Sequence, residues 1–133
     1  MKKTNTEFRS KCPLSIALEL IGDKWSLVIV RDLCLGKSKY GDFQSSPEGI
    51  PTNILASRLR QLEENGIVLK EPYQDKPTRY AYYLTEKGAD LLPVLQQLII
   101  WTQKYVPDCL TPPDVFFQLT PEELFLKHQQ DRP

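Results

Sequence analysis

A change of hydrophobic period at Gly66 limits the fold more strongly than any other feature of the chain. Before it, residues 51–66 (PTNILASRLRQLEENG) carry apolar side chains at helical spacing, which predicts an amphipathic helix. After it, IVLKEPY and RYAYYLT are β-rich runs separated by the turn residues QDKPT, which predicts a hairpin. The apolar helical positions are Ile54, Leu55, Leu59 and Leu62.

Three helices are expected before this point. Pro13 suits the first turn of a helix and Gly22 its end, while Asp23 can cap a second helix that runs to Gly36. A short helix, KYGDFQSS, then leads through the turn SPEGIP to residues 51–66. Helices followed by a two-stranded hairpin are typical of a winged helix-turn-helix, so we expect a mainly α fold with a small β-hairpin.

A long helix, EKGADLLPVLQQLIIWTQKYV, is expected after a cap at Thr85, with a kink or local break at Pro93. Its apolar residues cover most of the circumference, whereas a surface helix needs one stripe. This excess predicts a second buried face supplied by another subunit, that is, a homodimer. The residues assigned to that face are Leu95, Leu98, Ile99, Trp101 and Tyr105.

The 133 residues predict one domain over 1–110 and a tail over 111–133 with a short helix from Pro121. The sequence shows no apolar run of about 20 residues and no secretory signal, so we expect a cytoplasmic protein away from the membrane. Three cysteines without CxxC spacing and a lone His128 in a polar segment suggest no metal site. We find no catalytic constellation and expect neither an enzyme nor a cofactor.

The charge distribution fits a nucleic-acid partner. Residues 1–87 carry 14 Lys and Arg against 11 Asp and Glu, whereas residues 88–133 carry 3 against 6. In a winged helix-turn-helix the second helix of the pair enters the major groove of double-stranded DNA, and the hairpin lies beside it. The DNA contacts predicted on this basis are Thr52, Asn53, Ser57, Arg58 and Arg60 from the helix, with Lys76 and Arg79 from the hairpin tip.

Three ordered blocks resemble the HxlR-type family of winged-helix regulators. They are CPLSIALELIGDKWSLVIVRDL, GIPTNILASRLRQLEENGIV and YYLTEKGADLLPVLQQLIIW. The resemblance implies a homodimeric transcriptional regulator that binds a DNA operator and dimerises through its N- and C-terminal helices. It also implies that Cys12, in the Cys-Pro block, is a candidate sensor of oxidants or electrophiles. Asp23 replaces a usual Gly, and the polar FQSS departs from the family pattern.

The residues alone leave the role of Cys12 open. A helix N-terminus and the nearby Lys11 and Arg9 favour a thiolate, whereas burial would silence the thiol. Cys109 is a candidate partner for Cys12 across an intertwined dimer. Two alternatives remain, namely a winged-helix module that binds protein and a regulator that responds to a small molecule without thiol chemistry. The effector itself is not specified by the sequence.

Overall fold

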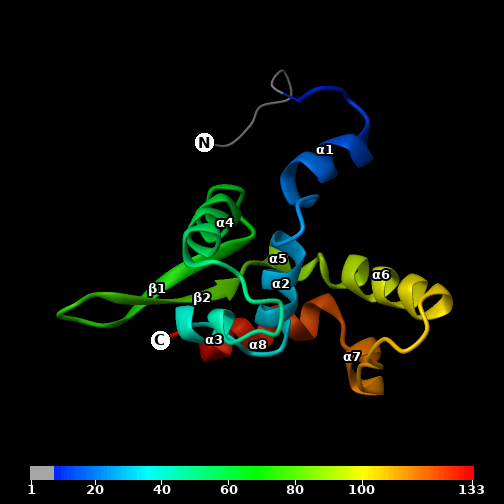
Figure 1. Ribbon diagram of the computed structural model, residues 1–133. Helices are drawn as coiled ribbons and strands as arrows, with labels where there is room; N and C mark the ends of the chain where they lie inside the picture. Colours follow the sequence, from blue (N-terminus) through cyan, green and yellow to red (C-terminus); the bar gives the residue numbers. More distant parts are fainter. Residues whose placement is uncertain (1–7) are drawn as a thin grey trace.

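The computed structural model describes residues 8–133 and has the expected order of elements (Figure 1). The first four helices are α1 (Pro13–Ile21), α2 (Ser26–Cys34), α3 (Tyr40–Gln44) and α4 (Thr52–Glu64). The remaining elements are β1 (Val68–Gln74), β2 (Arg79–Leu84), α5 (Glu86–Ala89), α6 (Leu92–Tyr105), α7 (Asp114–Gln118) and α8 (Pro121–Asp131). This arrangement confirms the winged helix-turn-helix. Within residues 8–133, no helix is both long and apolar enough to cross a membrane.

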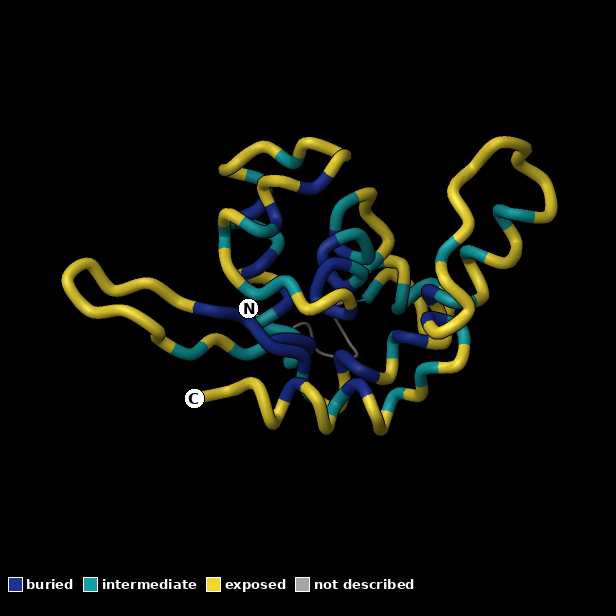
Figure 2. The backbone as a smooth tube through the Cα atoms, turned by 90° about the horizontal axis from the view of Figure 1, so that it is seen from below, coloured by how far each residue is buried: buried dark blue, intermediate teal, exposed yellow. Residues whose placement is uncertain are grey.

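The two strands form an antiparallel hairpin with an irregularity near its tip. Val68 pairs with Leu84, and the register shifts between Pro72 and Gln74. The base of the hairpin is buried, whereas its tip projects from the body of the molecule and is exposed (Figures 1 and 2). The Tyr82 amide also donates a hydrogen bond of 2.8 Å to the Ser38 carbonyl, which ties the hairpin to the start of the α3 region.

The core gathers side chains from nearly every element between α2 and α8. Apolar burial is the main favourable term in folding, so these residues fix the position of α4 relative to the hairpin. The largest fully buried apolar members are Ile29, Val30, Leu33, Phe43, Leu55, Leu59, Leu62, Val68, Leu84, Leu92 and Leu124.

The long helix expected after Thr85 is divided into α5 and α6. The Thr85 hydroxyl accepts a hydrogen bond from the Gly88 amide, as expected of a cap. Gly88 permits α5 to lie against the backbone just before β1, since an added Cβ would meet the Ile67 carbonyl oxygen at 2.1 Å. Pro93 lies in the first turn of α6, where its missing N–H has no intrahelical partner. The predicted local break is thus present and falls just before Pro93.

The segment after residue 110 packs on the same core. Phe116 and Leu124 are buried, and so is His128, which the sequence places in a polar tail. The Leu84 amide donates to Nδ1 of His128 at 2.9 Å, so Nε2 carries the proton and donates to the Leu33 carbonyl at 3.0 Å. Burial lowers the pKa of His128, which keeps the imidazole neutral. His128 therefore joins α8 to both α2 and β2.

Two helices, α1 and α6, project from the body of the molecule (Figure 1). Both leave apolar side chains exposed. No residue of α1 is buried, and Leu14 and Leu18 are 67% and 51% exposed. In α6, Trp101 and Tyr105 are each 62% exposed, and Leu98 is 48% exposed. Leu95 is a correction to the predicted dimer face, because its side chain packs in the chain's own core at 6% exposure.

Candidate nucleic-acid interface

Helix α4 buries one side and leaves polar groups on the other. Leu55, Leu59 and Leu62 enter the core, as the helical spacing predicts, while Thr52 and Asn53 are exposed at the N-terminal end. Arg60, two turns further on, is exposed, and Ser57 is half-buried. The predicted helical contacts are thus divided among exposed groups (Thr52, Asn53, Arg60) and partly covered ones (Ser57, Arg58).

The turn before α4 is held by a buried carboxylate on α2. Asp32 is 2% exposed and accepts a hydrogen bond from the Ser46 hydroxyl, and the Lys37 ammonium donates to the same hydroxyl at 2.9 Å. Arg31 donates to Asp32 and to Glu48, and its hydrogen bonds lower the pKa of Glu48 to about 2. Charged groups that are hydrogen-bonded in this way resist rearrangement, so the turn is rigid.

The two helices of the pair are also joined directly. The Gln44 side-chain amide of α3 donates to the Thr52 hydroxyl of α4 at 3.1 Å. Gly49 has a φ of +67°, which a side chain would strain, so the turn between the helices requires glycine there. Both observations fix the angle at which the N-terminal end of α4 leaves the body.

Asp23 connects the start of α2 to α4. Helix α2 begins at Ser26, two residues later than a cap at Asp23 predicts, with Trp25 at the N-cap position. The Asp23 carboxylate still accepts hydrogen bonds from the amides of Trp25 and Ser26 and from the Ser26 hydroxyl. It also accepts from Nε of Arg58 at 3.1 Å. Burial would raise the pKa of Asp23, but these hydrogen bonds together lower it. Arg58 is therefore engaged within the chain, which separates it from the other predicted DNA contacts.

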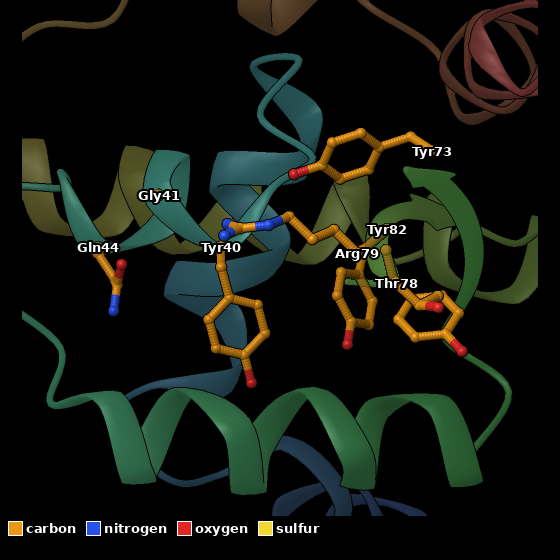
Figure 3. A pocket seen from close by; sticks show the side chains of 8 residues that line it. Tyr40, Gly41, Gln44, Tyr73, Thr78, Arg79 and Tyr82 are labelled. Atoms are coloured by element: carbon orange, nitrogen blue, oxygen red, sulfur yellow. The ribbon is translucent and has the colours of Figure 1, made fainter. Parts of the chain in front are cut away.

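A pocket of about 410 Å³ lies between α3 and the hairpin (Figure 3). Arg79 extends from β2 across this pocket toward Tyr40 and Gly41 of α3, and Tyr73 faces the same space from β1. Its other lining residues are Gln44, Thr78, Tyr80 and Tyr82. The hairpin and α3 thus present one continuous concave surface beside α4.

Tyrosines hold lysines in place around this surface. The Lys39 ammonium lies 4.4 Å from the Tyr73 ring centre, and the Lys70 ammonium lies 4.6 Å from that of Tyr80. Burial raises the pKa of Tyr40, while the charge of nearby Arg60 opposes the rise, so Tyr40 remains a neutral hydroxyl donor. We did not predict from the sequence that these tyrosines and lysines belong to the candidate interface. The signal that could have indicated it is the mixture of aromatic and basic residues in this part of the chain.

Cys12 is exposed at the start of α1, so burial does not silence it. The amides of Ser15 and Leu14, in that order, lower the pKa of its thiol. Arg9 was expected to contribute, but its guanidinium lies 3.0 Å from the Ser15 hydroxyl and 3.7 Å from the Glu19 carboxylate. The start of α1 and the segment after α6 that carries Cys109 are well apart within one chain (Figure 1).

The third cysteine differs from Cys12 in its surroundings. Cys34 is buried, and burial raises the pKa of its thiol to about 12. It therefore behaves as a small core hydrophobe. Within residues 8–133, no group of three or more His, Cys, Asp or Glu side chains is placed to hold a metal ion.

The comparisons with known proteins agree with this geometry. A family model described as HxlR-like helix-turn-helix matches residues 20–109. An HTH-type transcriptional regulator of Mycobacterium tuberculosis is 40% identical over 97 residues, which cover 73% of this chain and 61% of that protein. YdeP of Bacillus subtilis, also named an HTH-type transcriptional regulator, is 34% identical over 71% of this chain and 73% of its own.

Solved structures of regulatory proteins are also similar to this chain. The crystal structure of PA1607 is similar with a TM-score of 0.69 and 39% identity, covering 78% of this chain and 73% of its own. The reduced form of HypR, described as a redox regulator, has a TM-score of 0.64 and 33% identity, covering 69% of this chain and 91% of its own.

Proposed function

Because this chain belongs to the HxlR-like helix-turn-helix family, we propose that it is a transcriptional regulator that binds a double-stranded DNA operator. The observation that carries the proposal is the presentation of α4. Its apolar side is buried and its turn is held by Asp32, while Thr52 and Asn53 are exposed at the end that leads into a major groove.

We assign different roles to the residues of α4. Asn53 reads a base, since its amide can donate to and accept from adenine, and Thr52 and Ser57 contact base or phosphate. Arg60 is exposed and binds phosphate or guanine. Arg58 acts indirectly, because its ion pair with Asp23 positions α4 on the rest of the chain.

The hairpin supplies contacts that do not depend on base sequence. Lys76 and Arg79 are both exposed near the hairpin tip, and Arg79 lines the pocket beside α3. Lys39 and Lys70, which lie over Tyr73 and Tyr80 of that pocket, add positive charge. Contacts of this kind bind phosphates and release counterions, so binding falls steeply as salt rises.

The exposed apolar faces of α1 and α6 support a homodimer. Leu14, Leu18, Leu98, Trp101 and Tyr105 would be covered by the partner. Ile99 would contribute less, because it is half-buried and packs against the chain's own core. A two-fold dimer implies a pseudo-palindromic operator whose half-sites lie about one helical turn, or a multiple of it, apart.

The DNA test compares two substitutions on an operator selected from random double-stranded DNA. Asn53→Ala is expected to relax the base preference, whereas Arg79→Ala weakens binding to all sequences and flattens the salt dependence. Arg132→Ala, which removes an exposed arginine at the end of α8, is the matched control. It is expected to leave the base preference, the affinity and the salt dependence unchanged. Operator binding that survives both substitutions would reject this docking, and DNA binding absent at any salt would favour a protein-binding module.

We further propose that Cys12 senses oxidants. Its exposure and lowered pKa support this role, as does the similarity to HypR. The Cys12 thiolate would reduce hydrogen peroxide to water and become a sulfenic acid. Condensation with the thiol of Cys109 on a second copy would then release water and form a disulfide, provided that the Cα atoms come within about 7 Å.

Non-reducing electrophoresis after mild peroxide treatment tests this step. We expect a covalent dimer that disappears in Cys12→Ser and in Cys109→Ser, whereas Cys34→Ser retains it. A single monomer band in the wild type after oxidation would reject the linkage. Operator affinity that is the same before and after oxidation would reject Cys12 as a sensor and favour a regulator without thiol chemistry.

A further inference from the structure

A second cavity, of about 540 Å³, is lined by none of the residues that we propose to contact DNA. It is bounded by the end of α2, the middle of α6, the segment 110–113, α7 and α8. Its volume falls within the range of about 300–1,000 Å³ that is usual for small-molecule sites. Much of its wall comes from residues beyond 109, where the match to the HxlR-like family ends.

The wall of this cavity is largely apolar. Phe116 and Cys34 are buried in it, and Ile99 and Leu119 are half-buried, so together they form its inner surface. Val115, which is 67% exposed, stands at its edge. Pro112 and Pro113 restrict the backbone of the segment that closes one side. A concave surface of this composition favours an apolar body of small size.

Few polar groups line the cavity, and they differ in charge and in pairing. Arg31 lines the cavity, but it is paired with Asp32 and Glu48, and Lys37 lies 3.9 Å from Asp32, so these two cations offset the two carboxylates. Thr111 contributes a hydroxyl. Lys127 also lines the cavity, and no ion pair joins it to a carboxylate within residues 8–133. The net charge at this surface is therefore positive and is concentrated at Lys127.

We propose that this cavity binds a small amphipathic monoanion, such as a medium-chain or aromatic carboxylate. The carboxylate lies at Lys127 with Thr111 as an additional donor, and the apolar body lies along Ile99 and Phe116. The binding site follows from shape and charge on one chain and does not depend on the proposed DNA-binding function.

Occupation of this cavity would stabilise the chain in proportion to ligand concentration, because the unfolded chain has no such site. It would also bring α2, α6 and α7 into contact with one ligand. Since α2 carries Asp32, which holds the turn before α4, the ligand would contact the helix that supports the proposed DNA-reading end.

The test titrates the protein with octanoate or with its neutral analogue 1-octanol. Binding is detected by NMR as changes in the chemical shifts of the backbone amides. In the wild type we expect saturable shifts for residues 31–35, 99 and 110–127 with octanoate. Lys127→Gln is expected to weaken octanoate binding about threefold, in keeping with a partly exposed ion pair, and to leave 1-octanol binding unchanged.

Two tryptophan substitutions distinguish binding in this cavity from binding to the exposed apolar surface of α6. Val115→Trp fills the mouth of the cavity and abolishes octanoate binding, whereas Val94→Trp, on the exposed side of α6, leaves it intact. Both sites are exposed, so neither change should disturb folding. Shifts that do not saturate, or a loss of binding in Val94→Trp instead, would overturn the proposal. A changed oligomeric state in Val115→Trp would do so as well, since the cavity would then be a contact between copies.

Discussion

Helices α4 and α6 are of similar length but relate to the rest of the chain in opposite ways. Helix α4 buries Leu55, Leu59 and Leu62 and exposes polar groups on its other side. This is the pattern of a surface helix whose apolar stripe is covered by its own chain. Helix α6 buries Leu92 and Leu95, yet leaves Trp101 and other large apolar side chains exposed. Contiguous exposed apolar surface marks an interaction site, so the apolar side of α4 is covered within the chain, whereas α6 carries the face that we propose a second copy covers.

The largest expected effect tests the first half of this comparison. Leu59→Ala removes a side chain that is 1% exposed and leaves a cavity beside α4, so the free energy of unfolding should fall by about 2–5 kcal/mol. Urea titration followed by circular dichroism measures the change. Leu126→Ala, at a site 54% exposed on α8, serves as the control and should change it little. Equal losses in the two variants would contradict the assignment of Leu59 to the core.

The second prediction tests the other half. Trp101→Asp places a carboxylate on the exposed face of α6 and should raise the dimer dissociation constant at least about 30-fold. Light scattering over a dilution series measures it. Helical content should remain, because Trp101 contributes little to the core of its own chain. Leu126→Asp is the control, and a Trp101→Asp protein that dimerises like the wild type would remove α6 from the interface.

A smaller effect is expected at the joint between α2 and α4. Asp23→Ala removes the acceptor for the Trp25 and Ser26 amides and frees Arg58, so the unfolding free energy should fall by about 1 kcal/mol. Urea titration measures this, and Glu63→Ala is the control, since it removes only a long surface contact of 3.9 Å with Lys70. If the two variants are equally stable, Asp23 has no special role in fixing α4.

The smallest effect is a pH dependence at His128. The folded-state pKa of His128 is lowered, so its contribution is fully present above the unfolded value near pH 6.5 and is lost as the pH falls below that value. Between pH 7.5 and pH 6 the loss should be less than about 1 kcal/mol. Urea midpoints at several pH values measure it. His128→Gln should be less stable at pH 7.5 but show a flatter pH dependence, and an unchanged slope would exclude His128 as the source.

The sequence predicted what depends on local pattern. The leucine spacing of α4, the hairpin, the cap at Thr85 and the break near Pro93 each follow from neighbouring residues. Contacts between residues that are distant in the sequence could not be predicted in this way. The pairing of Arg58 with Asp23 spans 35 residues, and the inward direction of Leu95 depends on how α6 meets the core. Periodicity shows that a helix has an apolar face but not which neighbour covers it, so the structure was needed to show that Leu95 packs in the chain's own core while Trp101 is exposed.

His128 has a consequence for the order of events during synthesis. Its hydrogen bonds join it to Leu33 across 95 residues and to Leu84 across 44 residues. At a translation rate of about 5–20 residues per second, the end of β2 waits roughly 2–9 s for the imidazole that accepts its amide hydrogen. During that interval the hairpin base and the end of α2 lack a partner that they have in the finished fold. The ribosome therefore synthesises α4 and the hairpin before it adds the residue that joins β2 to α8.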